Sequence, residues 1–259
     1  MIEKIIHFSD LHIRLLKDHE NYRKIMTNAL NEWKEINPDR IVFTGDLVHS
    51  KNQITPELIG MVSWVLTECS KIAKTIIIPG NHDFLENNME RLDALTPIIE
   101  ALNNNSIFYY KERGVVEDEN IRWAIFSLMD GNIPPKIEKK RNFLTIGLFH
   151  GPIIGLTTDV GYKFENGFDS SLFDGCDFVF CGDIHKRQIF DYKGGKAFMI
   201  GSMISQNFGE SVKNHGYGLF TVTDKKYQTF DLINTKPFIK FKITSIEDIE
   251  NGKEILINK

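Results

Sequence analysis

Apolar residues in the first part of the chain alternate between short runs and stripes at helical spacing. The short β-branched runs at 4–8, 40–44 and 75–78 predict buried strands, because each stops at turn-forming residues. Between them, apolar residues recur every three or four positions over 20–36 and 56–74, which predicts two helices with core-facing stripes. This strand–helix–strand–helix–strand order favours a largely parallel sheet, with functional groups gathered beyond its carboxyl ends.

The second half of the chain has a different pattern. Residues 90–102 predict one more amphipathic helix, closed by the turn run at 103–105. Short apolar runs then predict strands at 107–110, 121–127, 143–149, 177–181, 196–200, 217–223, 227–232 and 237–244. This β-rich half predicts a second sheet packed on the first, with helices outside.

Composition places the chain among ordinary globular proteins. Its 259 residues correspond to one large domain, or to one domain with a small appendage. Apolar residues make up 42% and charged residues 25%, which is enough apolar surface for a sizeable core. No apolar run approaches the ~20 residues of a membrane span, and the N-terminus lacks a signal-peptide pattern. We therefore expect no membrane association.

The cysteines and the net charge bear on the cellular compartment and on nucleic-acid binding. Cys69, Cys176 and Cys181 form no CxxC pair, which indicates reduced thiols packed in the core of a cytoplasmic protein, or of a viral protein in the host cytoplasm. The net charge of −4 gives no overall signature of nucleic-acid binding. Carboxylates that bind cations count as negative in such a sum, so nucleic acid is not excluded.

Polar side chains follow the predicted strands of the first half. Asp10 and His12 come after the first strand and project the same way, because side chains alternate along an extended backbone. Gly45 allows a sharp turn after the second strand and places Asp46 at the same edge, with His49 following. A hard carboxylate next to an imidazole is half of a plausible transition-metal site.

The turn after the third strand carries three functional groups in succession. Asn81 offers a neutral oxygen to a metal, and His82 can transfer a proton near neutral pH. Asp83 can act in catalysis or cap a turn. In the second half, His150 and the pair Asp183 and His185 also follow predicted strands.

Five of the eight histidines thus lie just past strands, beside Asp, Asn or Gly. Each motif alone could be a polar turn, but together they predict a two-metal hydrolytic site. His7, which lies inside the first strand, is expected to pack in the core. The basic linker at 130–142 reads as a solvated surface loop, or as a loop that approaches nucleic acid.

The motif series Asp-x-His, Gly-Asp-x-x-His, Gly-Asn-His-Asp, His-Gly-Pro and Gly-Asp-x-His resembles the calcineurin-like metallophosphoesterase superfamily over residues 1–232. Within it, the chain is most similar to the nuclease subunit of SbcCD-type DNA-repair complexes (SbcD), including phage recombination counterparts. Protein phosphatases carry Asp-Arg where this chain has His49 and Ser50. The segment 200–203, leading to 207–210, also resembles the Gly-Ser segment found after the last metal motif in SbcD-like nucleases.

The resemblance implies an α/β fold, a four-layer αββα sandwich of two mixed sheets flanked by helices. It implies a metal-dependent DNA nuclease, with exonuclease and single-strand endonuclease activity, in DNA repair or recombination. A phosphodiesterase acting on small or cyclic nucleotides is the alternative. A non-catalytic DNA-binding subunit is a weaker third reading, motivated only by Asp183.

The family pattern also implies a role for each site residue. One metal ion would be held by Asp10, His12, Asp46 and His185, and the second by Asp46, Asn81, His150 and Asp183. Mixed nitrogen and oxygen ligands suit Mn(II), with Fe(II), Co(II), Zn(II) and Mg(II) as alternatives. His82 would protonate the leaving alkoxide, and His49 would place the DNA strand or orient His82.

Two features depart from the family pattern. SbcD-like proteins usually carry His at the position of Asp183, so this site has one more negative charge. That charge could tighten binding of the second metal or raise the pKa of its water. Lys186 and Arg187 could contact phosphate or balance Asp183.

The second departure is the short stretch at 233–259, which reads as a tail or as the start of a reduced or truncated capping domain. The implied partners are DNA and a homodimeric second copy. An SMC-like ATPase of SbcC type is a further partner if the natural chain carries a docking segment.

Overall fold

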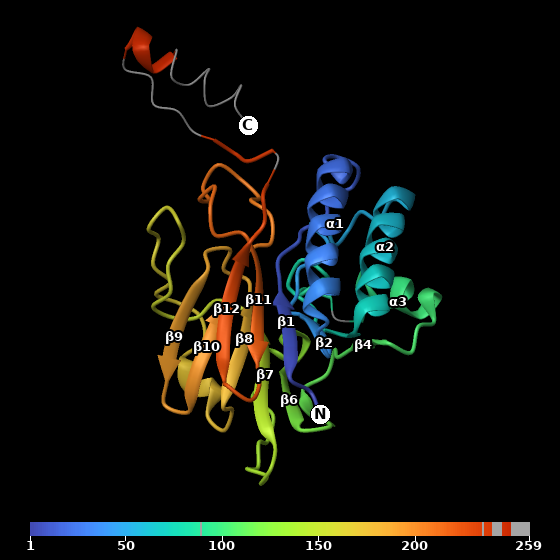
Figure 1. Ribbon diagram of the computed structural model, residues 1–259, viewed down its shortest axis with the longest axis vertical. Helices are drawn as coiled ribbons and strands as arrows, with labels where there is room; N and C mark the ends of the chain where they lie inside the picture. The colour runs from blue at the N-terminus through green and yellow to red at the C-terminus, as the bar shows by residue number, and fades with distance from the viewer. Residues whose placement is uncertain (89, 235, 240–244, 250–259) are drawn as a thin grey trace.

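Two six-stranded sheets form the centre of the molecule. The computed structural model describes residues 1–88, 90–234, 236–239 and 245–249. Helices α1 (His19–Ile36), α2 (Pro56–Ile72) and α3 (Thr96–Leu102) cover the outer face of the first sheet (Figure 1). The segment after β7 (Leu144–His150), with the 3₁₀ helix η2 (Ser170–Phe173), packs on the outer face of the second.

The first sheet has the order β12-β11-β1-β2-β3-β4. Its parallel part consists of β1 (Lys4–Phe8), β2 (Arg40–Phe43), β3 (Lys74–Ile77) and β4 (Ile107–Tyr109). The antiparallel edge consists of β11 (Gly216–Thr221) and β12 (Lys226–Asp231). Phe8 pairs with Phe43, and Phe43 with Ile77, so the first three strands end side by side.

The second sheet has the order β5-β6-β7-β8-β10-β9. Four parallel strands form its centre: β6 (Ile121–Phe126), β7, β8 (Phe178–Gly182) and β10 (Gly195–Met199). β5 (Gly114–Asp118) and β9 (Gln188–Tyr192) run antiparallel at the two edges. The 3₁₀ helix η1 (Leu128–Asp130) follows β6.

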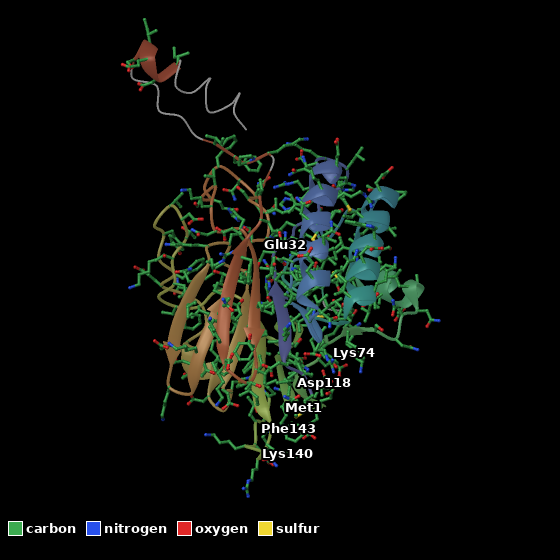
Figure 2. The ribbon with its side chains drawn as sticks, viewed as in Figure 1. Met1, Glu32, Lys74, Asp118, Lys140 and Phe143 are labelled. Carbon is green, nitrogen blue, oxygen red and sulfur yellow. The ribbon has the colours of Figure 1, made fainter. Side chains whose placement is uncertain are left out.

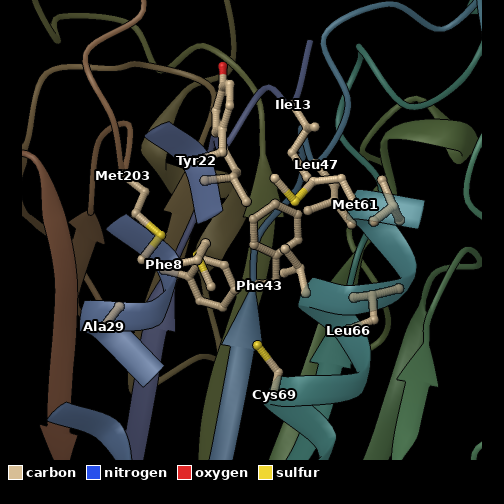
Figure 3. Close-up of a cluster of buried hydrophobic side chains, with 14 of the residues drawn as sticks. Phe8, Ile13, Tyr22, Ala29, Phe43, Leu47, Met61, Leu66, Cys69 and Met203 are labelled. Carbon is tan, nitrogen blue, oxygen red and sulfur yellow. The ribbon is translucent and has the colours of Figure 1, made fainter. Parts of the chain in front are cut away.

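Side-chain alternation along the strands creates three apolar layers. On β2, Ile41 and Phe43 pack against the helices, whereas Val42 faces the second sheet. Figure 3 shows the first of these layers, in which Phe43 and Leu66 lie between the sheet and α2. Phe149 of β7 belongs to the third layer, under η2.

The structure confirms two mixed sheets flanked by helices. The predicted secondary structure differs from the structure in three places, one of which lies partly outside the described residues. The helix predicted over 90–102 begins only at Thr96, because the Asp93 carboxylate accepts the N–H groups of Leu95 and Thr96 and Pro97 favours a first helical turn. The edge strands β5 and β9 were not predicted. Of the strand predicted at 237–244, residues 237–239 carry no strand and residues 240–244 lie outside the described part.

Two smaller predictions, on the cysteines and on His7, are confirmed. Cys69, Cys176 and Cys181 are buried free thiols. His7 is buried, with its ring stacked on Phe180 at 4.6 Å between centroids. Among the described residues, no helix is long and apolar enough to cross a membrane.

The basic linker at 130–142 reaches the end of the molecule opposite the strand ends that carry the predicted site. Lys140 lies near the start of β7, at the lower end of the view in Figure 2, where it pairs with Glu117 at 2.7 Å. This position favours the reading of its basic side chains as solvated surface groups.

We predict that Leu66→Ala lowers the free energy of unfolding by about 2–5 kcal/mol, because it leaves a cavity in the layer between α2 and the first sheet. Leu66 is 2% exposed, whereas Ile59 on the same helix is 41% exposed. The matched variant Ile59→Ala should cost less than about 1 kcal/mol. Urea unfolding followed by circular dichroism measures both, and equal losses would contradict the layer assignment.

Candidate metal centre

All nine predicted site residues gather where the parallel strands of both sheets end. Asp10 and His12 follow β1, Asp46 and His49 follow β2, and the remaining five lie after β3 or at the ends of β7 and β8: Asn81, His82, His150, Asp183 and His185. The two sheets meet here, since the Nδ1–H of His150 on β7 donates to the Thr44 carbonyl after β2 at 2.6 Å. The carboxyl edges of both sheets therefore form one site.

Four of these residues have an unusual backbone. Asp10, His12, Asp46 and Asp183 have φ of 52°, 47°, 62° and 99°, in the left-handed region that residues with side chains rarely adopt. Each such residue costs on the order of 1–3 kcal/mol unless its surroundings enforce it. Here they do, since Asp10 N donates to Gly45 O at 3.0 Å and His12 N donates to Asp46 O at 3.0 Å. The strained turns point these side chains to a common centre.

Glycines make the close approach of these turns feasible. A Cβ on Gly80 would overlap the Asp46 carboxylate, and a Cβ on Gly45 would overlap the His150 ring. Gly45 also has φ of 98°, as the sharp turn predicted from the sequence requires. No larger residue fits at either position without moving the site.

The first ligand group is formed by two imidazoles and two carboxylates. His12 Nε2 lies 3.0 Å from His185 Nε2. Asp10 Oδ1 is 3.9 Å from the former and 3.8 Å from the latter. Asp46 Oδ2 lies 3.4 Å from His12 Nε2. Ring nitrogens and carboxylate oxygens that converge in this way fit one divalent cation between them.

The second ligand group lies on the other side of Asp46. His150 Nε2 is 3.2 Å from Asn81 Oδ1, 3.5 Å from Asp46 Oδ2 and 3.8 Å from Asp183 Oδ1. Asp46 Oδ2 thus belongs to both groups, as expected for a carboxylate that bridges two cations. The structure thus brings together the residues of both ligand sets implied by the sequence, including Asp183, where SbcD-like proteins usually carry His.

The electrostatics of the centre also favour cations. Burial raises the pKa of Asp10, and it raises the pKa of Asp183 to about 6. Burial works in the same direction on Asp46, but His150 and His12 hold the pKa of that carboxyl below its usual range. Asp10 and Asp46 are buried and Asp183 is half-buried, so three carboxylates in one place repel each other. Divalent cations would relieve this repulsion.

Asp83 joins the turns after β2 and β3. Its carboxylate accepts N–H groups from Gly80, Asp46, Leu47 and Val48 at 2.9–3.1 Å. The residue is fully buried, and burial raises its pKa to about 7. Of its two sequence readings, these contacts support that of a turn-stabilising residue.

His82 and His49 lie side by side next to the first ligand group. The His82 ring is 5.5 Å from the His49 ring at an interplanar angle of 23°. The Nδ1–H of His82 donates to the His49 carbonyl at 2.8 Å, and its backbone N–H donates to Asp46 Oδ1 at 2.8 Å. These bonds leave His82 Nε2 as the ring nitrogen that can exchange a proton with a substrate.

Two site residues were missed by the sequence reading. Arg14 Nη1 donates to His49 Nε2 at 3.1 Å, and burial lowers the pKa of His49, so that ring is a neutral acceptor. Glu210 Oε1 accepts a hydrogen bond from His185 Nδ1 at 2.7 Å. A carboxylate behind a metal-binding imidazole fixes the orientation of its ring. The segment containing Glu210 was noted in the sequence only for its resemblance to SbcD-like nucleases.

Comparison with known proteins identifies the family to which the chain belongs. The sequence model described as "Calcineurin-like phosphoesterase" matches residues 3–187. The chain belongs to this family. Members use divalent metals to hydrolyse phosphate esters, and the phosphoesterase described here has candidate metal-ligand residues for that chemistry.

Similar proteins were also found among curated sequences and solved structures. The phosphoesterase is 35% identical over 263 residues to uncharacterized protein R555 of Acanthamoeba polyphaga mimivirus. The match covers 96% of this chain but only 19% of R555.

Two solved structures cover most of the phosphoesterase. A novel archaeal phosphodiesterase is 14% identical with a TM-score of 0.47, covering 89% of this chain and 99% of its own. A phosphopantetheinyl hydrolase from Mycobacterium tuberculosis is 11% identical with a TM-score of 0.48, covering 77% and 89%.

We predict that Asp46→Ala abolishes binding of two Mn(II) ions, because it removes the one oxygen shared by both ligand groups. Metal-stripped protein should bind two ions per chain by isothermal titration calorimetry, and the variant at most one, at least about 100-fold more weakly. Asp191→Ala, which changes an exposed carboxylate on β9, serves as the control. Two ions bound by the Asp46 variant would contradict the bridging role.

Metal affinity should increase with pH. Burial works to lower the pKa of His185, but the hydrogen bond to Glu210 and the nearby carboxylates raise it to about 9. A metal ion must displace this proton at neutral pH, so affinity should rise about tenfold per pH unit between pH 7 and 9 for each proton released. Calorimetry in two buffers of different ionisation enthalpy counts the protons. Glu210→Gln should reduce the release, and no release in the unmodified protein at pH 7 would contradict this prediction.

Proposed function

We propose that this phosphoesterase is a DNA nuclease of SbcD type, with exonuclease and single-strand endonuclease activity, acting in DNA repair or recombination. The observation that carries the proposal beyond phosphoester hydrolysis is a basic cavity of about 520 Å³ lined by Arg14, the residue that donates a hydrogen bond to His49. It adds to the motif resemblance, in which His49 replaces the Asp of phosphatases.

The basic cavity combines cations with aromatic rings. Arg14, Lys17 and Lys236 line it, against the single carboxylate of Asp18. Phe208, which is 55% exposed, and Phe238 also line it, with their rings 5.0 Å apart. Positive charge follows a phosphate backbone and aromatic faces stack with bases, which is the combination found in single-strand binding grooves. A small nucleotide would not need so extended a basic surface.

The chemistry fits a phosphodiester at this place. Two divalent ions, Mn(II) in this proposal, would activate the attacking water and neutralise charge on the phosphate. Asp46 holds the two ligand groups together, and Glu210 keeps the His185 ring in position. His82, fixed through its Nδ1–H, would protonate the leaving oxygen from Nε2. Arg14 keeps the His49 ring in place and presents its charge toward the basic cavity.

The same proposal extends to domain organisation and partners. Residues 1–232 would form the nuclease domain, and 233–259 a tail or the start of a capping domain. A homodimer and an SMC-like ATPase of SbcC type would be its protein partners. Because the chain spans less than a fifth of R555, the activity and partners of the whole relative stay outside this proposal.

Hydrolysis of small or cyclic nucleotides is the second candidate function. It is favoured by a smaller cavity of about 350 Å³ that borders Asp183 and His185 and has the size of a small-ligand site. Faster turnover of a cyclic nucleotide than of any DNA would favour it.

We predict that His82→Ala lowers Mn(II)-dependent cleavage of end-labelled single- and double-stranded DNA by at least about 100-fold, because the leaving alkoxide is no longer protonated. Hydrolysis of bis-p-nitrophenyl phosphate should change by less than about tenfold, because p-nitrophenolate leaves without a proton. Bound Mn(II) should be unchanged. Gel analysis of the DNA and absorbance of nitrophenolate measure the two reactions.

Either of two results would contradict the proposal. Normal DNA cleavage by the His82 variant would remove the general-acid role. Unmodified protein that hydrolyses bis-p-nitrophenyl phosphate but neither DNA would remove the nuclease function while leaving the metal centre intact.

A further inference from the structure

The cavity beside Asp183 and His185 has a wall that the metal chemistry does not use. The loop after β7 forms one side of it, and the segment 207–210 forms another. In Figure 1 this yellow loop stands at the upper end of the second sheet, beside the orange loop that precedes β11. Asp159 of the first loop accepts the backbone N–H of Ser211 at 3.0 Å, which joins the two loops.

The loop presents apolar side chains at the rim of this cavity. Tyr162 is 58% exposed and Val160 is 68% exposed, and both line the cavity. Phe164 supports the Tyr162 ring edge-on, at 5.2 Å between centroids and 81° between planes. A single exposed apolar residue needs no explanation, but this pair and its supporting ring lie next to two metal-binding residues.

The loop is held in place by its own hydrogen bonds. Thr158 N donates to Tyr162 O at 2.8 Å, and Phe164 N donates to Leu156 O at 2.9 Å. Gln188 on β9 holds Thr157 from both sides, accepting its N–H at 3.0 Å and donating to its carbonyl at 2.9 Å. The Tyr162 ring is therefore presented by an ordered turn, and little ordering cost is left for binding.

The charges of the cavity select an uncharged group. Asp159, Asp183 and Glu210 line it, and its basic groups are Lys186 and the His185 ring, which is paired with Glu210. The basic cavity has the opposite balance, with three cations and one carboxylate. A second phosphate would be repelled from the acidic cavity, whereas an uncharged aromatic ring would be accepted. Every nucleobase offers such a ring, and any of the bases can stack on a Tyr side chain.

We infer that the cavity lined by Tyr162 and Val160 is a nucleobase subsite. It holds the base of the nucleotide whose phosphate lies on the metal centre, with the Tyr162 ring as the stacking surface. The inference rests on the proposed function, because it assumes a nucleotide phosphate at that centre. It also applies to a small-nucleotide substrate.

The test compares two ligands that differ only in the base, 2′-deoxyguanosine 5′-monophosphate and 2-deoxyribose 5-phosphate. Calorimetry with the Mn(II)-loaded full chain should show the nucleotide bound about tenfold or more tightly. Tyr162→Ala should remove this preference and leave the affinity for deoxyribose 5-phosphate unchanged. Tyr162→Phe should keep the preference, because the phenyl ring still stacks. Ile189→Ala, an exposed apolar residue on β9, should behave like the unmodified protein.

Other results would overturn the inference. Equal affinity of the unmodified protein for both ligands, or binding of neither at millimolar concentration, would exclude a base subsite. Equal weakening of both ligands in Tyr162→Ala would show a disturbed metal centre instead. Because the assay needs no turnover, it separates the two proposals. A base preference without DNA cleavage would refute only the nuclease function, and DNA cleavage without a base preference would refute only the subsite.

Discussion

The carboxylate of Asp46 is the group on which the rest of the site depends. Its Oδ2 lies within 3.5 Å of one imidazole from each ligand group, and its Oδ1 accepts the backbone N–H of His82. Its own backbone N–H donates to Asp83. The residue therefore connects both ligand groups, His82 and the turn after β3. Any shift of Asp46 would move these four parts of the site apart.

The architecture explains how such a residue can be held. Carboxyl ends of parallel strands from two facing sheets meet at one edge. The turns after β1, β2, β3 and β8 therefore pack closely together in a small volume. Glycine at 45 and 80 lets two of these turns come close, and left-handed backbone at Asp10, His12 and Asp46 directs their side chains inward. The strain of these turns is offset by the three apolar layers, which fix the strand ends from which they start.

The pattern of apolar and polar residues along the chain predicted the features that are determined by neighbouring residues in the sequence. The central strands follow from apolar runs, and the candidate site residues could be selected because each stands within a few residues of a strand end. Arg14 and Glu210 could not be found in this way, since their partners His49 and His185 lie far along the chain and only the packed loops bring them together. The edge strands β5 and β9 were missed because half-exposed edge strands carry a weaker apolar signal. The start of α3 depends on the Asp93 side chain, which competes with the helical pattern around it.

The segment 206–210 links the metal centre to its surroundings. The Gln206 carbonyl accepts a hydrogen bond from Arg14 Nη2, and the Glu210 carboxylate accepts one from His185 Nδ1. This one loop therefore contacts Arg14, which donates to His49, and His185, a candidate metal ligand. It also separates the basic cavity from the acidic one, since Gln206 and Phe208 line the first while Asn207 and Glu210 line the second. If the proposed function holds, a DNA strand that crosses the metal centre would meet cations on one side and an uncharged aromatic wall on the other. Charge asymmetry of this kind orients a nucleotide by its own chemistry, because the backbone carries the charge and the base does not.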